Sequence, residues 1–231
     1  MNGTDTDTFI EWMSAAVPGS LGKLEKEARA KGVPVIRKSA QSFLGFFCTL
    51  LKPDRILEIG SGVGFSALLM RNYVCCRILG IELDCDRAAE AEKNIREAGF
   101  SDDIEIRCAD AADVLRELAG GEGQDGAEHF DLVFLDGPKG QYLQYLPYIE
   151  KLTREGGVLA ADNLLKEGEI LRSRYAVTRR NRTIHRKMRE FITEMTRSGR
   201  WQTMLIGDGD GMLAAVRKPD AAPDTGTDRT V

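Results

Sequence analysis

Two acidic residues, Asp136 and Asp162, each follow an apolar run that is typical of a buried strand. Asn163 comes directly after the second of them. Ligands of open α/β sheets bind outside the carboxyl ends of the strands, so neighbouring strands would bring these side chains together. Two carboxylates and an amide, without His or Cys, suit a hard cation such as Mg²⁺, Mn²⁺ or Ca²⁺. The alternative interpretation is that both aspartates cap the helices that follow.

Lys139 lies three positions after Asp136, in the stretch DGPK. From there its amine can reach a substrate hydroxyl held by the cation. A cation lowers the pKa of such a hydroxyl, so a neighbouring lysine can accept the proton, and Lys139 is the candidate catalytic base. The two histidines, His129 and His185, fall in a polar loop and in a basic helix. We interpret both as surface residues without a catalytic role.

A glycine-rich turn, ILEIGSGVGFSALLM, joins a strand-like run to a helical pattern. Gly60, Gly62 and Gly64 let the backbone approach a ligand, and the start of the helix offers free N–H groups to a carboxylate or phosphate. The dinucleotide fingerprint would need a further glycine at position 65, which is Phe65, so a nicotinamide cofactor fits poorly. A nicotinamide oxidoreductase is therefore the disfavoured alternative.

Two later turns are typical of nucleoside binding. Glu82 ends the second strand-like run, where a carboxylate accepts both hydroxyls of a ribose. Asp110 and Ala111 follow the third run, where an adenine amino group would lie. The alternative is an ordinary pair of turns with a solvated glutamate and a helix-capping aspartate.

The elements that carry these residues alternate between strand and helix. Five β-rich runs cover 55–60, 77–83, 104–108, 130–136 and 156–162. This alternation predicts βαβ units and an α/β fold with a parallel, doubly wound sheet. After a helix over about 179–198, runs at 201–207 and 211–217 flank DGD and predict an antiparallel pair. Two helices, over 18–32 and 39–53, precede the first strand.

Length and composition favour a single domain. The chain has 231 residues, 42% of them hydrophobic, and a net charge of -4, which argues against a globally basic nucleic-acid binder. We expect one domain over 1–218, with a helical N-terminal cap over about 1–52 and a disordered tail at 219–231. The sequence has neither a cationic leader nor a long apolar run, so we expect a cytoplasmic protein without membrane contact.

The cysteines and one glycine-rich loop carry no functional prediction. Five cysteines form an odd set without C-x-x-C spacing, which predicts reduced, buried thiols and neither a disulfide framework nor a zinc site. They are Cys48, Cys75, Cys76, Cys85 and Cys108. The loop AGGEGQDGAEH at 119–129 is polar and rich in glycine.

Taken together, ILEIGSGVGFSALLM, GIELD, DGPK and ADN resemble the divalent-metal-dependent class I S-adenosylmethionine (SAM) O-methyltransferases, which include catechol and caffeoyl-coenzyme A methyltransferases. The resemblance covers roughly residues 33–218. It implies a seven-stranded sheet with an antiparallel last strand, methyl transfer to an oxygen and a homodimer. It makes Asp136, Asp162 and Asn163 the metal ligands and Lys139 the base. Around SAM it places Glu58, Gly60, Gly62, Ser66, Glu82, Asp110 and Ala111.

Within that family, KGQY, DNLLKEGEI, RRNRTIHRKMREF and LIGDGDGMLAAVRK resemble bacterial tRNA 5-hydroxyuridine methyltransferases. The resemblance implies transfer to the 5-hydroxyl of a wobble uridine, whose O4 would help to chelate the metal as the second oxygen of a catechol does. This chain has DGPKGQY where that group typically has DAAKGQY, and Pro34 is followed by Arg37 and Lys38 where an acidic residue is common.

A basic segment between Lys166 and Arg189 favours a tRNA substrate, because it can hold the phosphates of an anticodon loop. Its nine basic residues are Lys166, Arg172, Arg174, Arg179, Arg180, Arg182, Arg186, Lys187 and Arg189. The alternative is a solvated helix face, with some arginines paired at a dimer interface. Two other functions stay open: the same chemistry on a catechol-like small molecule, and a catalytically silent RNA-binding module.

Overall fold

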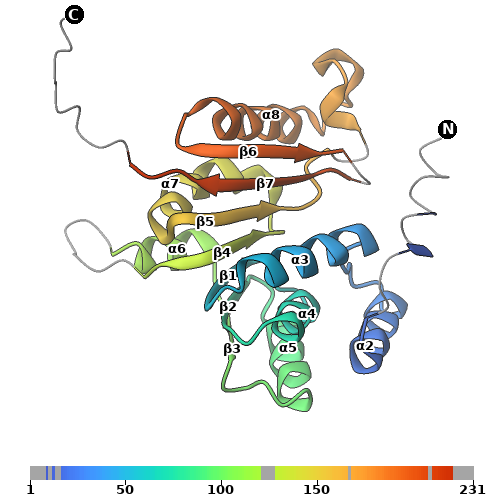
Figure 1. The fold of residues 1–231 in the computed structure, drawn as a ribbon. Helices are drawn as coiled ribbons and strands as arrows, with labels where there is room; N and C mark the ends of the chain where they lie inside the picture. Colours follow the sequence, from blue (N-terminus) through green and yellow to red (C-terminus); the bar gives the residue numbers. More distant parts are fainter. Residues whose placement is uncertain are drawn as a thin grey trace, which may run out of the picture.

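The computed structural model describes residues 9, 12–13, 17–120, 128–165, 168–207 and 210–220. Seven strands form one sheet in the order β3-β2-β1-β4-β5-β7-β6 (Figure 1). The strands are β1 (Arg55–Ile59), β2 (Arg77–Glu82), β3 (Ile104–Cys108), β4 (Phe130–Leu135), β5 (Thr153–Ala161), β6 (Trp201–Ile206) and β7 (Met212–Arg217).

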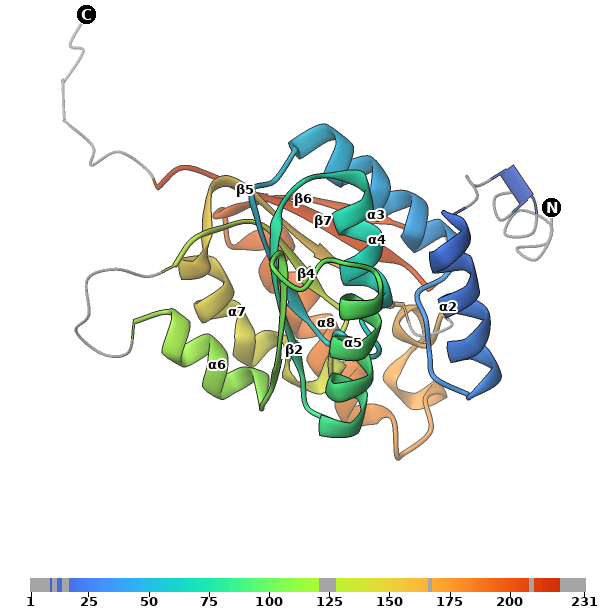
Figure 2. The same ribbon diagram turned by 90° about the horizontal axis from the view of Figure 1, so that it is seen from below.

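Helices cover both faces of this sheet. They are α2 (Gly19–Ala30), α3 (Lys38–Leu51), α4 (Phe65–Tyr73), α5 (Cys85–Glu97), α6 (Ala111–Leu118), α7 (Tyr142–Leu152) and α8 (Arg182–Arg197), with short 3-10 turns η1 (Lys139–Gln141), η2 (Glu169–Leu171) and η3 (Arg174–Ala176). Figure 2 shows α4 and α5 on one face, and α6 and α7 on the other. The predicted α/β class, with helices on both faces, is confirmed.

Strand residues alternate between two hydrophobic cores. Ile56 and Leu132 pack with α2 to α5, whereas Leu57 and Val133 pack with α6 to α8. Because both faces are covered, the central strands β2 and β4 and the second half of β5 are mostly apolar. This explains why continuous apolar runs mark them in the sequence.

The predicted pairing is also confirmed. Strands β1 to β5 pair in parallel, and β7 runs antiparallel to both β5 and β6. Two boundaries differ from prediction. Strand β5 begins three residues early, at Thr153, because an irregularity in the pairing with β4 lets Thr153 pair with Phe130. Helix α8 begins at Arg182 rather than near 179, since residues 179–181 form a turn.

The strand order reverses between β1 and β4, which is the position where doubly wound sheets bind ligands. The backbone just beyond the two strands is very close there. A Cβ on Gly60 would lie 2.4 Å from the carbonyl oxygen of Asp136, and Gly60 has φ +95°. Only glycine fits this contact, and it brings the glycine turn against the loop that carries Asp136.

Two expectations about single residues are wrong. Cys85 and Cys108 form a disulfide, and the free Cys75 is exposed, so only Cys48 and Cys76 are the buried thiols predicted from composition. His185 is not a surface residue. It is buried, and its Nε2 lies 3.1 Å from the carbonyl oxygen of Arg172, which ties α8 to the segment before it.

Residues 121–127 of the glycine-rich loop and 221–231 of the expected tail lie outside the described residues. Within the described ranges, the longest helices are too short or too polar to span a lipid bilayer.

Candidate functional site

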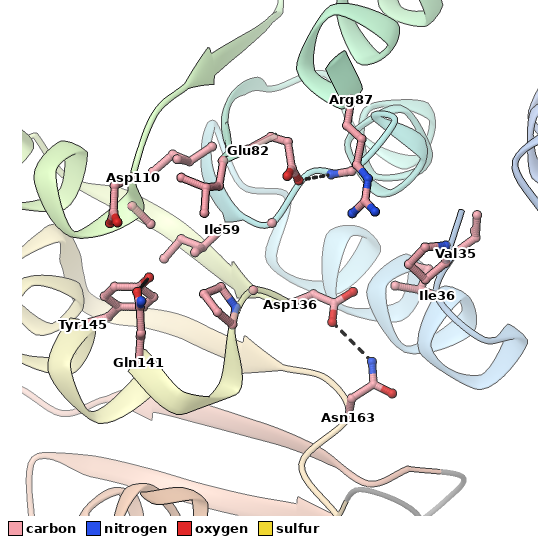
Figure 3. A pocket seen from close by; sticks show the side chains of 18 of the residues that line it. Val35, Ile36, Ile59, Glu82, Arg87, Asp110, Asp136, Gln141, Tyr145 and Asn163 are labelled. Atoms are coloured by element: carbon pink, nitrogen blue, oxygen red, sulfur yellow. Dashed lines mark hydrogen bonds between the residues drawn. The ribbon is translucent and has the colours of Figure 1, made fainter. Parts of the chain in front are cut away.

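A cavity of about 530 Å³ opens at the carboxyl edge of the sheet, over β1, β2, β3 and β4. Seven of the residues predicted from the sequence line it: Gly60, Gly62, Glu82, Asp110, Ala111, Asp136 and Asn163. Figure 3 shows Glu82 and Asp110 on one side of this cavity and Asp136 with Asn163 on the other. The structure therefore brings the predicted nucleoside residues and the predicted oxygen ligands to one pocket.

Glu82 is fixed at the nucleoside end of the pocket. Its side chain is buried, its Oε2 accepts a hydrogen bond from the backbone N–H of Gly62 at 2.8 Å, and its Oε1 accepts one from Asp84 at 3.0 Å. Asp84, rather than Glu82, caps α5. Glu82 is thus not the solvated residue of the alternative interpretation, and its carboxylate is oriented by both turns.

Asp110 has a structural role as well as a place in the pocket. Its carboxylate accepts a hydrogen bond from Ala112 N–H at 2.7 Å and caps α6, as the capping alternative proposed. A cap of this kind still faces the cavity, which Asp110 and Ala111 both line. The two interpretations are therefore compatible at this position.

Glu58 lies below the glycine turn and is fully buried. Neither carboxylate oxygen has a hydrogen-bond partner among the described residues, although the hydroxyls of Ser66 and Ser61 are close. Burial raises the pKa of Glu58 to about 7, although the hydroxyls of Ser66 and Ser61 oppose the shift. Ser61, Ser66 and Asp136 also line a small recess of about 30 Å³ beside the turn. An unpartnered buried carboxyl in this place suits a cationic ligand group.

The pKa of Glu58 leads to a stability prediction. A carboxyl whose folded pKa is raised stabilises the fold below its unfolded pKa of about 4.3, and this contribution is lost as the pH rises through about 7. Glu58→Gln should therefore raise the free energy of unfolding of the ligand-free protein at pH 8 by about 3 kcal/mol, and by little at pH 4.5. Urea denaturation at the two pH values measures this.

Glu92→Gln makes the same chemical change at an exposed position of α5 and serves as the control. It should leave the free energy of unfolding unchanged at both pH values. A Glu58→Gln protein that is no more stable than wild type at pH 8 would show that the carboxyl carries no burial penalty.

Asp136 and Asn163 line the opposite end of the pocket, and Asp162 contacts Asn163. The Asn163 amide donates to Asp136 Oδ1 at 3.2 Å (Figure 3). It also donates to Asp162 Oδ2 at 3.2 Å. Asn163 has φ +59°, in the left-handed region, and its backbone N–H donates to Asp162 Oδ1 at 2.7 Å. Strain of this kind is common at functional sites. Neither aspartate caps a helix, so the capping alternative is not supported here.

Both carboxylates have a raised affinity for protons. Burial, followed by the charge of Asp162, raises the pKa of Asp136 to about 7. Burial likewise raises the pKa of Asp162. The positive charge of Lys139 opposes both shifts. A second positive charge beside Asp136 and Asp162 would lower their pKa values and favour the ionised forms of both carboxylates.

Lys139 begins η1, just outside the residues that line the cavity. The turn is held from α8, because Lys187 Nζ donates to the carbonyl oxygen of Gly140 at 2.8 Å. A hydrogen bond from Tyr145 to Gln141 holds its other end. Lys187, counted as a possible phosphate contact in the sequence, thus supports the turn that carries Lys139.

Several lining residues escaped the sequence analysis. Arg37 and Asp210 form an ion pair of 3.1 Å across the pocket, although 173 positions separate them. Leu83 follows Glu82 directly and Arg87 lies in the first turn of α5, so their position after a nucleoside-type turn was the available signal. No signal in the sequence marked Tyr145 on α7 as a pocket residue, because it resembles an ordinary core residue.

These features define an α/β enzyme that binds a nucleoside-type cofactor at the switch point of its sheet, next to a cluster of carboxylates. A family model described as O-methyltransferase matches residues 13–218. The chain therefore belongs to the O-methyltransferase family. It is an enzyme of the SAM-dependent type.

Relatives and solved structures agree with this. A catechol O-methyltransferase of Mycobacterium tuberculosis is 31% identical over 174 residues, which are 74% of this chain and 76% of that protein. One from Niastella koreensis is 33% identical over 144 residues, 61% of this chain and 63% of that protein. The O-methyltransferase of Bacillus cereus in complex with SAH has a TM-score of 0.79 at 23% identity, covering 93% of this chain and 97% of that one.

Proposed function

We propose that the protein is a divalent-metal-dependent O-methyltransferase whose acceptor carries two adjacent oxygens, with 5-hydroxyuridine in tRNA as the acceptor. The observation that carries the metal proposal is the convergence of Asp136, Asp162 and Asn163 at one end of the cofactor pocket. Oxygen ligands of this kind suit Mg²⁺, Mn²⁺ or Ca²⁺.

The chemistry of the three side chains fits a cation. Two neighbouring carboxylates with raised pKa values are unfavourable together unless a positive charge lies between them. Asn163 presents its NH₂ group to both, and a half-turn of the amide would present its oxygen instead. The described residues contain no cluster of three His, Cys, Asp or Glu side chains, so the amide would be the third ligand.

The chain's own residues have distinct roles in this proposal. Glu82, Asp110, Ala111, Gly60 and Gly62 orient the nucleoside part of SAM, which supplies the methyl group. Glu58, with Ser66 beside it, lies where it can balance a positive charge of the cofactor.

At the acceptor end, Asp136, Asp162 and Asn163 would hold the cation. When bound, the cation would supply the positive charge that makes an acceptor hydroxyl more acidic. Lys139, three positions after Asp136, accepts the proton at its Nζ, and its positive charge acts on both carboxylates.

The tRNA acceptor is supported by the exposed part of the basic segment. Arg172, Arg179 and Arg180 are exposed and have no side-chain hydrogen bond or ion pair within the described residues. They lie in the segment between η2 and α8. Figure 1 shows this segment next to the start of α8. Backbone hydrogen bonds from Leu164 and Leu165 to the β6–β7 turn hold the start of this segment beside Asn163.

The other basic residues of the segment mostly serve the fold. Arg186 pairs with Glu190, and Arg182 and Arg189 donate to backbone carbonyls. Lys166 and the side chain of Arg174 lie outside the described residues. The candidate phosphate contacts are therefore fewer than the sequence indicates.

The test compares acceptors and arginine variants. Labelled SAM is incubated with Mg²⁺ and tRNA that carries 5-hydroxyuridine, with catechol in parallel, and both reactions are repeated with EDTA. We expect EDTA-sensitive label in tRNA. Arg179→Ala combined with Arg180→Ala should lower kcat/KM for tRNA roughly tenfold and leave catechol turnover unchanged.

The control combines Arg96→Ala with Arg197→Ala, two exposed arginines elsewhere on the surface. It should change neither reaction. Label in catechol alone would reject the tRNA acceptor, and EDTA-resistant label would reject the metal. Unchanged tRNA methylation by the Arg179 and Arg180 variant would remove the basic segment from substrate binding.

A catechol-like small molecule is the second candidate acceptor. It is favoured by the two relatives named as catechol O-methyltransferases. The same three oxygen ligands and Lys139 would serve it, because a catechol also presents adjacent oxygens.

We also propose the homodimer that the family resemblance implies. Phe46 and Leu50 on α3 and Met204 on β6 are exposed apolar side chains that such a contact would bury.

A further inference from the structure

A disulfide joins two elements beside the cofactor pocket. Cys85 is the first residue of α5 and Cys108 is the last residue of β3. Their Cα atoms are 5.2 Å apart, within the usual range for a disulfide. Both residues are exposed, so small thiols and disulfides can reach them.

The bond spans the two turns that form the nucleoside end of the pocket. Glu82, Leu83 and Arg87 line one wall, and Ala109, Asp110 and Ala111 line the other. The last backbone hydrogen bond between these walls runs from the N–H of Ala109 to the carbonyl oxygen of Glu82, at 3.0 Å.

Beyond that point, the Cys85–Cys108 bond is the link between the walls. No hydrogen bond or ion pair connects residues 83–87 with 110–114 in the described part of the chain.

We propose that Cys85 and Cys108 are a redox-sensitive clamp on the cofactor pocket, which closes by exchange with a small disulfide such as oxidised glutathione. The inference rests on the cofactor pocket assigned above and goes beyond the proposed acceptor.

The exchange balances in two steps. A thiolate of the pair attacks the glutathione disulfide, forms a mixed disulfide and releases one glutathione thiolate. The second cysteine thiolate then attacks the sulfur of its partner, forms the Cys85–Cys108 bond and releases the second glutathione. Two protein thiols are oxidised, one glutathione disulfide is reduced to two thiols, and the two protons lost by the cysteines are taken up, through solvent, by the two glutathione thiolates.

The clamp should act on cofactor affinity. In the oxidised protein Leu83, Arg87 and Asp110 are held in the arrangement that lines the cavity. In the reduced protein the two turns separate more freely, so cofactor binding must order them first. We expect the Kd for SAH to rise roughly three- to tenfold on reduction.

The experiment uses the full chain with Cys75→Ser, which removes the exposed free thiol. Cys48 and Cys76 are buried, so alkylation of the native protein should modify two cysteines after reduction and none after treatment with oxidised glutathione. Calorimetry then gives the Kd of SAH for each form. The matched variant adds Cys85→Ser and Cys108→Ser, and its Kd should equal that of the reduced form under both conditions.

Each outcome decides between defined alternatives. Equal Kd values for the oxidised and reduced forms would overturn the clamp, as would two alkylated cysteines after glutathione treatment. A redox-dependent Kd in the serine variant would assign the effect to another group. If SAH bound neither form, the assigned cofactor pocket would be wrong, which is a different failure from loss of the clamp.

Discussion

Asp136→Asn should lower kcat for methyl transfer by roughly a thousandfold while the Kd for SAH stays within about twofold. The carboxylate of Asp136 lies against Asn163 and beside Asp162, at the acceptor end of the pocket and away from Glu82. Turnover of an acceptor and calorimetric binding of SAH and Mn²⁺ measure the three effects, and Mn²⁺ binding should weaken together with kcat.

The same substitution should stabilise the ligand-free protein. Burial and the charge of Asp162 raise the pKa of Asp136 to about 7, so at pH 8 the folded chain carries an unfavourable charge that asparagine removes. A purely structural residue would lose stability instead.

Asp102→Asn is the control, because Asp102 is exposed in the turn before β3, at the opposite edge of the sheet. It should change neither kcat nor stability. An Asp136→Asn enzyme with kcat within threefold of wild type would exclude the aspartate from the reaction.

Lys139→Ala should lower kcat by about a hundred- to a thousandfold and preserve SAH affinity. The positive charge of the lysine acts on both carboxylates, and Lys139 is not among the residues that line the nucleoside end of the pocket. Single-turnover methylation with the cofactor bound in advance separates this loss from binding.

Lys139→Arg distinguishes two explanations of that loss. Arginine keeps the positive charge near Asp136 and Asp162, but it does not release its proton at neutral pH and so cannot act as a base. If Lys139 accepts the acceptor proton, the arginine variant stays as slow as the alanine variant. If arginine restores turnover, the residue contributes its charge alone.

Much of the fold could be predicted because the sheet is covered on both faces. Runs such as 55–60 and 130–136 are mostly apolar, and turns rich in glycine or aspartate separate them from amphipathic helices. The antiparallel end could be predicted from one short turn between two apolar runs. The start of β5 could not, because it depends on an irregular pairing with β4 that no local pattern encodes.

The position of the pocket could be predicted from one rule of sheet topology. Residues after β1, β2, β3, β4 and β5 must meet at the same edge, so Gly60, Glu82, Asp110, Asp136 and Asn163 could be placed together from the sequence. Arg37 and Asp210 could not, since their contact depends on how the helical N-terminal part and the β6–β7 turn dock over that edge.

The predictions that all cysteines are free thiols and that His185 lies at the surface were wrong, for reasons that the structure shows. A count of cysteines shows only whether their number is odd or even. The register between β2 and β3 pairs Glu82 with Cys108, and this pairing brings Cys85 within bonding distance of Cys108. His185 shares one face of α8 with Met188 and Met195, and this spacing indicates burial more strongly than the charged neighbours indicate exposure.

The ion pair between Arg37 and Asp210 makes the entrance of the pocket responsive to ionic strength. Its arginine side chain is 48% exposed, and a pair of this kind contributes at most about 1 kcal/mol. Thermal motion breaks so weak a contact often, and dissolved salt weakens it further. The side-chain contact between Arg37 and Asp210 should therefore weaken as the salt concentration rises, without unfolding either the helical N-terminal part or the sheet.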